Sequence, residues 1–492
     1  MKVPLNSRSR AVAFPLALFF LALVLRILLS GAKSLWGDEF YAAGLMNGSF
    51  AELVRSSFQG SPHPPLAFLG LKISALLFGV SEAGLRGVPA LLTSLAVVPL
   101  FLFVKSRTSE LSSFIACLLW AVSPYSVSLG QEAWLYGILA FAGFTFIWLS
   151  DLAWRGNRKA ALFLVPVGLL GMLVQHLFFL FLSAGFLLYF TLDKGKRVSI
   201  KSFFLQALIM ALVYLPFLFP ALEQAGLRSE RVGYSTTSGV ILHRFLFRVP
   251  TVTARLIAGG IAGELSLWSF RSPVTPAIFL VSLLSVVIPV VVFLFRGSSE
   301  LKFRIWAGGL FIVPLLLFFK EDPTARHLSI MWLPLAMAMA HLAERHRPAV
   351  LLVLLTTVIL LLPYYRLDTF PYHRSNWRRA VAFTEIESEN RGQVVILAGQ
   401  NGGLAWDYYS SGRVDRIALG GETPYEVQAT RSTWDPASAV DSLLESGTEV
   451  FVVHDIWGGA SGENIAPRWP MISRREFGPH LEVVHFGTGN SQ

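Results

Sequence analysis

Two adjacent carboxylates, Asp38 and Glu39, follow the first long apolar segment of the chain, within the run Trp36 to Tyr41. A carboxylate beside an apolar surface is partly desolvated, and it accepts a proton more readily than a carboxylate in bulk water. Accepting the proton of an alcohol is the task of a general base in group transfer. We therefore predict Asp38 and Glu39 as catalytic residues; the alternative is an ordinary solvated helix start with its N-terminal cap.

A second set of polar residues stands at the ends of other apolar segments. Arginine binds an anion with a bidentate fork and lysine with a compact charge, so both suit a phosphate at a water-poor boundary. An arginine at such a boundary can also snorkel to lipid headgroups, which is the alternative for Arg26. The predicted substrate-binding residues are His63, Arg86, Glu132, Tyr136, Lys320, Arg326 and His327.

The elements that must position these residues are predicted to be membrane spans. The chain has 492 residues, of which 54% are hydrophobic and only 15% charged, and this composition is too apolar for an ordinary soluble domain. Apolar runs recur from Ala11 to Tyr365, and such runs cross a hydrocarbon core about 30 Å thick as helices. The eleven predicted spans are 11–30, 86–104, 111–128, 134–153, 160–175, 177–192, 201–220, 274–295, 303–319, 327–343 and 349–365.

One further apolar stretch, Pro64 to Val80, is predicted to form an interfacial helix in the first outer loop rather than a span. It is short, opens with two prolines and carries Lys72 in its middle. If it crossed the membrane, most of the later clusters of Lys and Arg would face outward, against the positive-inside rule. The chain is thus predicted to be a multi-pass protein of the cytoplasmic (inner) membrane, with its active site and its tail outside the cytoplasm.

The tail after Tyr365 has a different composition, because polar and turn residues replace the apolar runs. Strands are predicted at 393–398, 449–454 and 480–486, and helices at 376–389 and 436–446. This alternation is typical of a small α/β domain. We therefore predict a transmembrane catalytic domain over residues 1–365 and an extracytoplasmic α/β domain over residues 366–492.

Composition also argues against several classes of site. The single cysteine, Cys117, cannot make a disulfide framework or a cysteine-based metal site. The net charge of +10 is spread in short clusters between apolar runs, which argues against nucleic-acid binding. The histidines are dispersed and no HExxH motif is present, so a metal would have only carboxylates such as Asp38 and Glu132 as ligands. We predict no required metal or cofactor.

Several motifs, taken in chain order, resemble those of the GT-C membrane glycosyltransferases of the protein O-mannosyltransferase and aminoarabinose transferase type. Each motif is short, but together they cover nearly the whole chain. One departure is Trp134, where that family often has an arginine. The motifs are Asp38-Glu39, His63-Pro64-Pro65, FGVSEAGLR ending in Arg86, SPYSVSLGQEAWLYG around Glu132, the Arg326-His327 turn and SNWRRAV from Ser375 to Val381.

The resemblance implies a polyprenyl-phosphate-linked sugar donor, an active site at the outer face of the membrane and an inverting direct displacement. It also implies that Asp38 is the catalytic base, and that Glu39 and Glu132 shape the pocket for the acceptor and the sugar. Arg86, Lys320 and Arg326 are the implied phosphate ligands. The acceptor would be a glycan, a lipid or a protein.

Two other classes of function remain open from the sequence. A transporter or flippase of a lipid-linked or envelope substrate also has many spans and intramembrane charges. Such a protein would carry polar side chains through to the cytoplasmic side and would often show broken helices in two repeated halves. A non-catalytic scaffold whose tail domain does the binding is the second alternative, and it predicts that Asp38 is dispensable.

Overall fold

The chain divides into two compact units in a computed structural model. One unit is helical and comprises residues 1–30, 50–77 and 86–365, and the other comprises residues 31–49, 78–85 and 366–492. Residues 31–49 and 78–85, which precede the second predicted span, therefore cluster with the tail rather than with the helices. The structure describes residues 7–59, 63–232, 254, 257–258, 261, 274–297, 300–316, 325–365, 376–391, 394–398, 402–414, 416–419, 436–455, 466–478 and 481–488.

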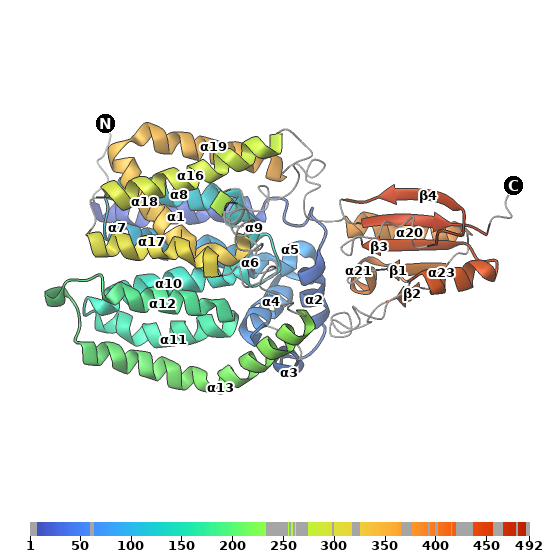
Figure 1. Ribbon diagram of the computed structural model, residues 1–492, viewed down its shortest axis with the longest axis horizontal. Coiled ribbons are helices and arrows are strands. Elements are labelled where there is room, and N and C mark those ends of the chain that lie inside the picture. Colours follow the sequence, from blue (N-terminus) through green and yellow to red (C-terminus); the bar gives the residue numbers. More distant parts are fainter. Residues whose placement is uncertain are drawn as a thin grey trace, which may run out of the picture. The chain divides into compact units, whose positions relative to one another are not determined.

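The helices of the first unit lie side by side, and Figure 1 shows α10, α11, α12 and α13 as one such group. The helices described in this unit are α1 (Ser7–Ile27), α3 (Phe50–Gln59), α4 (Pro65–Phe78), α6 (Gly87–Leu95), α7 (Val97–Lys105), α8 (Glu110–Val122), α9 (Pro124–Gly130), α10 (Tyr136–Trp154), α11 (Arg158–Val174), η1 (His176–Phe178), α12 (Phe179–Tyr189), η2 (Lys194–Lys196), α13 (Ile200–Val232), α16 (Val274–Arg296), α17 (Leu301–Leu316), η6 (Ala325–Met331), α18 (Trp332–Arg345) and α19 (Arg347–Tyr365).

The predicted span 111–128 is not one straight helix, because it breaks between α8 and α9 with a bend of 58°. Pro124 opens α9 and has no N–H to continue the backbone ladder of α8. The side chain of Ser123 caps the new helix by accepting a hydrogen bond from the N–H of Ser126 at 3.2 Å. The sequence pattern of apolar residues continues across this break, so hydropathy alone did not reveal it.

The predicted count of about eleven spans is not confirmed. Within the described residues, four helices are long and apolar enough to cross a membrane, or up to five if α8 and α9 make one broken span. The four are Glu82–Lys105, Tyr136–Trp154, Ile200–Leu218 and Phe279–Arg296. Other apolar helices have only 10–17 described residues, and α4, the predicted interfacial helix, is one of them.

The membrane-facing surface is clearest on α13. Only 11% of the Ile200–Leu218 segment is buried inside the protein, although its mean hydropathy is 1.7. Phe204, Leu208 and Leu212 are among its exposed side chains. An apolar surface of this kind is stable in lipid and costly in water, so the chain is a membrane protein.

The second unit contains a mixed five-stranded sheet with the order β2-β1-β3-β5-β4. β1 pairs in parallel with β2 and β3, whereas β5 pairs antiparallel with β3 and β4. The elements described in this unit are α2 (Gly37–Leu45), α5 (Glu82–Leu85), α20 (Trp377–Arg391), β1 (Val394–Ala398), α21 (Gly402–Tyr409), β2 (Arg416–Leu419), α23 (Pro436–Glu445), β3 (Val450–Asp455), β4 (Met471–Glu476) and β5 (Leu481–Phe486).

A hydrophobic core forms between α23 and the central strands. Val440 and Leu444 from α23 pack with Val450 and Val452 from β3 and with Val484 from β5, and each of these side chains is at most 1% exposed. The three predicted strands and two predicted helices of the tail are confirmed as β1, β3, β5, α20 and α23, with ends shifted by at most two residues. The short elements β2, β4 and α21 were not predicted.

Candidate active site

Tyr136, Arg326 and His327 come together at the start of α10. The Tyr136 Oη and His327 Nε2 atoms lie 2.7 Å apart, and the two rings meet edge to face at 4.9 Å. The guanidinium carbon of Arg326 lies 5.2 Å from the centre of the Tyr136 ring. The group combines a cation, a hydroxyl and an imidazole, which are donors and charges that suit a phosphate. We call these three residues the Tyr136 cluster.

The residues that follow Arg326 and His327 in η6 hold these two polar side chains in place. Leu328, Ile330 and Met331 are each at most 2% exposed, so the apolar part of the turn is anchored in the helical unit. Leu328 has non-helical backbone angles, φ −109° and ψ 26°, and marks a kink inside η6. His327 is 5% exposed, and it therefore reaches Tyr136 within the protein rather than in solvent.

Glu132 is buried in the turn between α9 and α10, where it is 2% exposed. The preceding residue, Gln131, fastens this turn to the end of α1. Its Nε2 donates to the carbonyls of Leu28 at 2.7 Å and Leu25 at 3.3 Å, and its Oε1 accepts from Tyr364 Oη at 3.1 Å. These bonds satisfy carbonyls that a helix end leaves without partners in its own ladder. Gln131 therefore sets the position of Glu132.

His63 lies in a polar and aromatic corner of the helical unit. Gln175 Nε2 donates to its Nδ1 at 3.3 Å, and its ring meets the Trp134 ring edge to face at 5.2 Å. Trp134 also contacts Phe68 edge to face at 5.6 Å. Trp134 therefore packs against two rings, at the position where the similar family often has an arginine.

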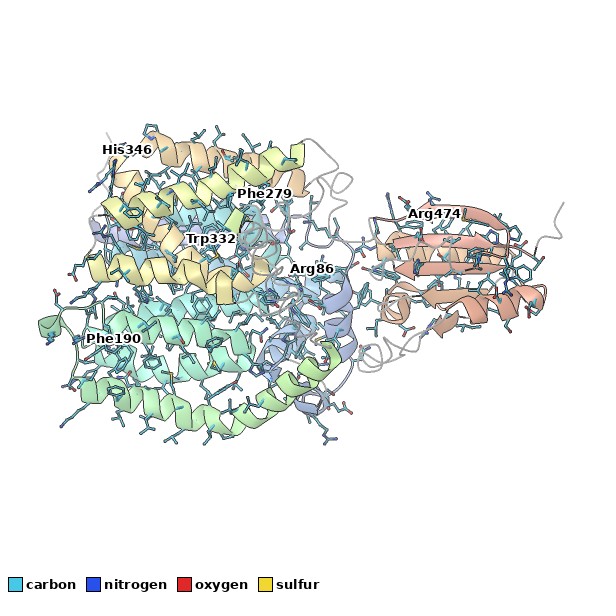
Figure 2. All side chains as sticks on the ribbon, viewed as in Figure 1. Arg86, Phe190, Phe279, Trp332, His346 and Arg474 are labelled. Atoms are coloured by element: carbon cyan, nitrogen blue, oxygen red, sulfur yellow. The ribbon has the colours of Figure 1, made fainter. Side chains whose placement is uncertain are left out.

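Arg86 and Arg26 are fully buried, at 0% exposed, and both turn into the protein (Figure 2 labels Arg86). Arg86 donates to the backbone carbonyl of Ser30. Arg26 donates to the carbonyls of Ala22, Ala121 and Trp120 at 2.8, 3.2 and 3.4 Å. The snorkelling alternative for Arg26 is therefore wrong, because its guanidinium binds backbone carbonyls inside the protein.

Asp38 and Glu39 lie in the second unit, in the first turn of α2. Glu39 is 0% exposed and Asp38 is half-buried, so the solvated helix start does not describe Glu39. The N-cap of α2 is Trp36, which makes no side-chain cap hydrogen bond, and neither carboxylate takes the capping position. Helix capping therefore does not explain why two acidic residues stand in the first turn of α2.

Lys320 lies outside the described residues, so its predicted phosphate role stays a prediction. Of the other predicted residues, Tyr136, Arg326 and His327 come together, and His63, Arg86 and Glu132 occupy buried or half-buried positions in the same unit. Asp38 and Glu39 belong to the other unit.

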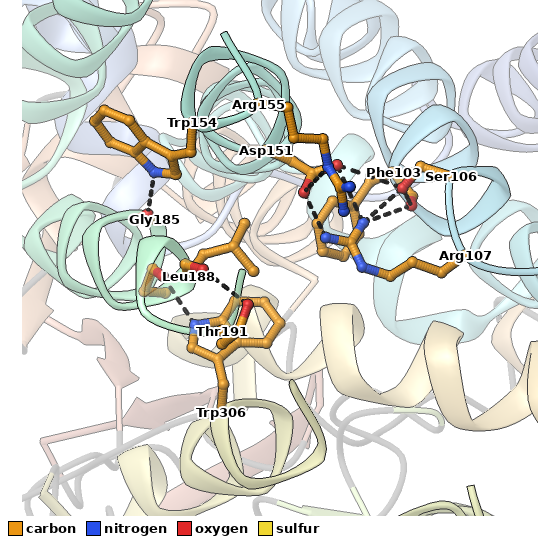
Figure 3. A network of polar contacts seen from close by, with 11 residues as sticks. Phe103, Ser106, Arg107, Asp151, Trp154, Arg155, Gly185, Leu188, Thr191 and Trp306 are labelled. Carbon is orange, nitrogen blue, oxygen red and sulfur yellow. Dashed lines mark hydrogen bonds and ion pairs between the residues drawn. The ribbon is translucent and has the colours of Figure 1, made fainter. Parts of the chain in front are cut away.

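The far end of α10 carries a different polar network, shown in Figure 3. Asp151 accepts from Arg107 Nη2 at 2.5 Å and from Arg155 Nε at 3.1 Å, and Arg107 also lies 4.3 Å from the Phe103 ring centre. Along the axis of α10, Asp151 lies about 22 Å from Tyr136. Between them α10 carries two hydroxyl side chains, Thr145 and Ser150, and both donate to carbonyls one turn back in their own helix. α10 therefore offers no continuous polar path between its two ends.

Sequence reasoning missed Glu82, Arg378 and Tyr409, which form a network in the second unit. Glu82 Oε1 accepts from Tyr409 Oη at 2.9 Å and from Arg378 Nε at 3.1 Å. Glu82 and Arg378 do lie within two of the short motifs, FGVSEAGLR and SNWRRAV. In the sequence, the opposite charges of Glu82 and Arg378 in these two motifs were the signal that could have suggested this contact.

Comparisons with known proteins agree with this architecture. A family model described as dolichyl-phosphate-mannose-protein mannosyltransferase matches residues 62–222, which is less than half of the chain. No curated protein sequence matches.

Two of the solved structures that are similar in fold are those of ArnT and AglB. ArnT from Cupriavidus metallidurans, bound to undecaprenyl phosphate, aligns over 96% of this chain and 97% of its own, with 13% identity and a TM-score of 0.55. The archaeal oligosaccharyltransferase AglB from Archaeoglobus fulgidus, in complex with an inhibitory peptide and a dolichol-phosphate, aligns over 98% of this chain and 74% of its own, with 15% identity and a TM-score of 0.51. At these identities the likeness is one of fold. The chain thus shares the fold of these membrane glycosyltransferases, and one third of it, residues 62–222, matches the dolichyl-phosphate-mannose-protein mannosyltransferase model.

Proposed function

We propose that the protein transfers a sugar from a polyprenyl-phosphate-linked donor to an acceptor hydroxyl. The observation that carries the proposal is the Tyr136 cluster, because a cation, a hydroxyl and an imidazole meet at the start of a membrane helix. Such groups stabilise the charge that develops on a leaving phosphate. The similar ArnT and AglB structures hold undecaprenyl phosphate and dolichol-phosphate, which supports a lipid phosphate as the leaving group here.

In the proposed reaction the bond between the sugar C1 and the phosphate oxygen breaks, and a bond from the acceptor oxygen to C1 forms. The phosphate leaves with the electron pair, and Arg326 with Arg86 and Lys320 supplies positive charge to it. Asp38 takes the proton of the acceptor hydroxyl, and Glu39 and Glu132 shape the site for the acceptor and the sugar. A single displacement of this kind inverts the configuration at C1, and no second carboxylate needs to act as a nucleophile.

We place this reaction at the outer face of the cytoplasmic membrane. The support is the distribution of Lys and Arg, which under the positive-inside rule puts residues 105–107, 155–159 and 194–201 in the cytoplasm. The transferred sugar would be a hexose or a pentose, and the acceptor a glycan, a lipid or a protein. The arginines and lysine supply the charge that a metal ion would otherwise provide, so the proposal requires no resident metal.

α10 carries no continuous polar path between the Tyr136 cluster and the Asp151 network, so this helix does not line a polar route for a transported substrate. A transporter needs polar groups along the route of its substrate.

The experiment that tests the proposal is turnover in liposomes. The purified protein is reconstituted with a panel of undecaprenyl-phosphate-linked hexoses and pentoses and with envelope extract as the source of acceptor. The expected result is release of undecaprenyl phosphate together with transfer of the labelled sugar, both lost in Asp38→Asn. Passage of intact donor across the bilayer without cleavage would replace the transferase with a flippase, and normal turnover by Asp38→Asn would remove its role as the base.

A further inference from the structure

The helix that carries Asp38 packs against the C-terminal domain. Phe40, the second residue after Asp38, is 1% exposed. Its ring meets three aromatic rings edge to face, with centroid distances of 6.1 Å to Trp377, 6.2 Å to Tyr408 and 5.9 Å to Tyr409. These three rings come from α20 and α21. Phe40 of α2 therefore packs against two helices of the C-terminal domain.

A polar network fastens the chain on both sides of α2 to the same two helices. Arg378 Nη2 donates to the Gly31 carbonyl at 2.9 Å, and Tyr409 Oη accepts from the Leu35 N–H at 2.8 Å. Glu82 receives hydrogen bonds from both Arg378 and Tyr409 through one oxygen, Oε1. Arg378 and Tyr409 thus bind residues that precede α2 and a residue that follows it.

The charges in this network are matched. Burial lowers the pKa of Arg378, but the hydrogen bond and the charge of Glu82 outweigh burial, so the pKa is raised and the guanidinium stays charged. Burial raises the pKa of Tyr409 to about 12, so its hydroxyl keeps the proton that it donates to Glu82.

The helices α20 and α21 are themselves anchored to the sheet domain. Ala380 and Val381 of α20 are 0% exposed, and Ala405 and Trp406 of α21 are 0% and 2% exposed. The N–H of Asn376, just before α20, donates to the carbonyl of Phe477 at 2.6 Å. A position set by these helices is therefore set by the folded domain as a whole.

By itself, α2 could not hold a catalytic group in place. It has nine residues and no side-chain cap hydrogen bond at Trp36. Helices shorter than about 12 residues are marginal without tertiary contacts. A catalytic base must stay within a fraction of an ångström of its productive position, and an error of about 1 Å costs roughly 100-fold in rate.

We propose that the C-terminal α/β domain is a positioning element for Asp38, and that Arg378, Tyr409 and Trp377 are its positioning residues. The proposal rests on the proposed function, in which Asp38 is the general base. In this proposal the C-terminal domain affects the rate of the chemical step. A domain that only bound the acceptor would affect the affinity for the acceptor instead.

The two roles differ in kinetics. Loss of positioning lowers kcat, because the base is displaced while both substrates still bind. Loss of an acceptor-binding module raises the KM for the acceptor and leaves kcat at saturation unchanged.

The experiment compares Arg378→Gln, Glu82→Gln and the double variant with Asp38→Asn in the liposome assay. The two single variants are expected to lower kcat about 10- to 100-fold with donor and acceptor KM values within about threefold of the wild type. The double variant should lose no more than the worse single variant, because both act through one contact. Arg378→Lys keeps the charge and should recover part of kcat.

The matched control is Arg413→Gln. Arg413 lies in the same domain and pairs with Glu389 at 3.6 Å, but its side chain is 67% exposed and touches no part of α2 in any described contact. Wild-type kcat is expected for this variant.

If Arg378→Gln or Glu82→Gln does not fold, Tyr409→Phe decides the matter, because it keeps the ring beside Phe40 and loses only the hydroxyl. It is expected to lower kcat several-fold. The positioning role would be overturned if the folded Arg378→Gln, Glu82→Gln and Tyr409→Phe variants had wild-type kcat, or if only their acceptor KM rose. The proposed function would still stand in that case, provided that Asp38→Asn was inactive. Full activity of Asp38→Asn would instead remove Asp38 as the general base and the positioning role with it, whereas absence of sugar transfer by the wild type would overturn the proposed function.

Discussion

The guanidinium of Arg26 donates a hydrogen bond to the backbone carbonyl of Ala121 at 3.2 Å, at the point where α8 breaks. A broken helix leaves carbonyls without partners, and a fully buried arginine supplies donors for them. Gly130 leaves room for this side chain, since a Cβ there would come within 2.6 Å of Arg26 Cδ. Arg26 is thus a structural residue, and it stabilises the bend that leads to Glu132.

Replacement of Arg26 by methionine should lower the stability of the helical unit. The carbonyls of Ala121 and Trp120 would lose a charged donor in a buried place, at a cost of about 1–3 kcal/mol. Thermal unfolding in detergent measures the change, with the exposed Arg158→Met as the control. An unchanged midpoint for Arg26→Met would show that the break does not need this donor.

Asp38→Asn should abolish sugar transfer while folding and membrane insertion stay intact. The amide keeps the size of the side chain but accepts a proton poorly, so turnover should fall about 100- to 10,000-fold. Asp407→Asn is the control, because Asp407 is 50% exposed and pairs with Arg416. Equal losses in both variants would mean that the effect comes from the fold and not from Asp38.

Arg326→Ala should raise the donor concentration needed for half-maximal rate more than the acceptor concentration. Loss of a charged hydrogen-bond donor to a phosphate costs about 1.5–3 kcal/mol, or roughly 10- to 100-fold in donor affinity. Tyr136→Phe removes the hydroxyl that meets His327 and should act in the same direction with a smaller effect. Arg345→Ala, an exposed arginine on the helix after η6, is the control. Donor dependence like that of the wild type would discard the phosphate role of Arg326.

Asp151→Asn should destabilise the helical unit by about 3–5 kcal/mol, because it leaves Arg107 without its countercharge. The side chains of Arg107 and Asp151 are only 9% and 1% exposed. The neighbouring pair Lys105–Glu110, at 31% and 23% exposed, provides the comparison, and Glu110→Gln should cost less than about 1 kcal/mol. Similar unfolding midpoints for the two variants would contradict the difference in burial.

The hydroxyl of Tyr409 should make the stability of the second unit fall at alkaline pH. Its folded pKa is about 12 against an ordinary value of 10.0, mainly because burial disfavours the phenolate. The stabilisation is therefore complete below pH 10 and is lost as the pH rises toward about 12. Protease resistance of the wild type should decline more steeply over this range than that of Tyr409→Phe. Parallel declines would show that Tyr409 does not contribute.

Much of the local structure could be read from the sequence, as the tail domain shows. The predicted strands at 393–398 and 449–454 contain the apolar runs Val394 to Ala398 and Val450 to Val453, which are rich in β-branched residues and lie in β1 and β3. β4 could not be predicted in this way, because all six residues from Met471 to Glu476 are exposed and carry no alternation. It becomes a strand through its pairing with β5, and that pairing is not a local property.

In the candidate site, too, some features could be predicted from the sequence and others could not. Residue type and place along the chain were enough to single out Asp38, Glu132 and Arg326. Nothing local pairs Glu82 with Arg378, because 296 positions separate them in the chain. Their contact depends on a folded sheet domain that carries Arg378 on α20.

By itself the sequence determined that this is a helical membrane protein with an α/β tail. Whether a segment lies in lipid or in water, and whether it forms a helix or a strand, depends largely on the composition and periodicity of nearby residues. Only the tertiary structure decided that the helix of Asp38 belongs with the tail, that Arg26 turns inward and that the third predicted span is broken. Hydrophobic partition acts on every residue separately, whereas a hydrogen bond between distant side chains exists only after the chain has folded.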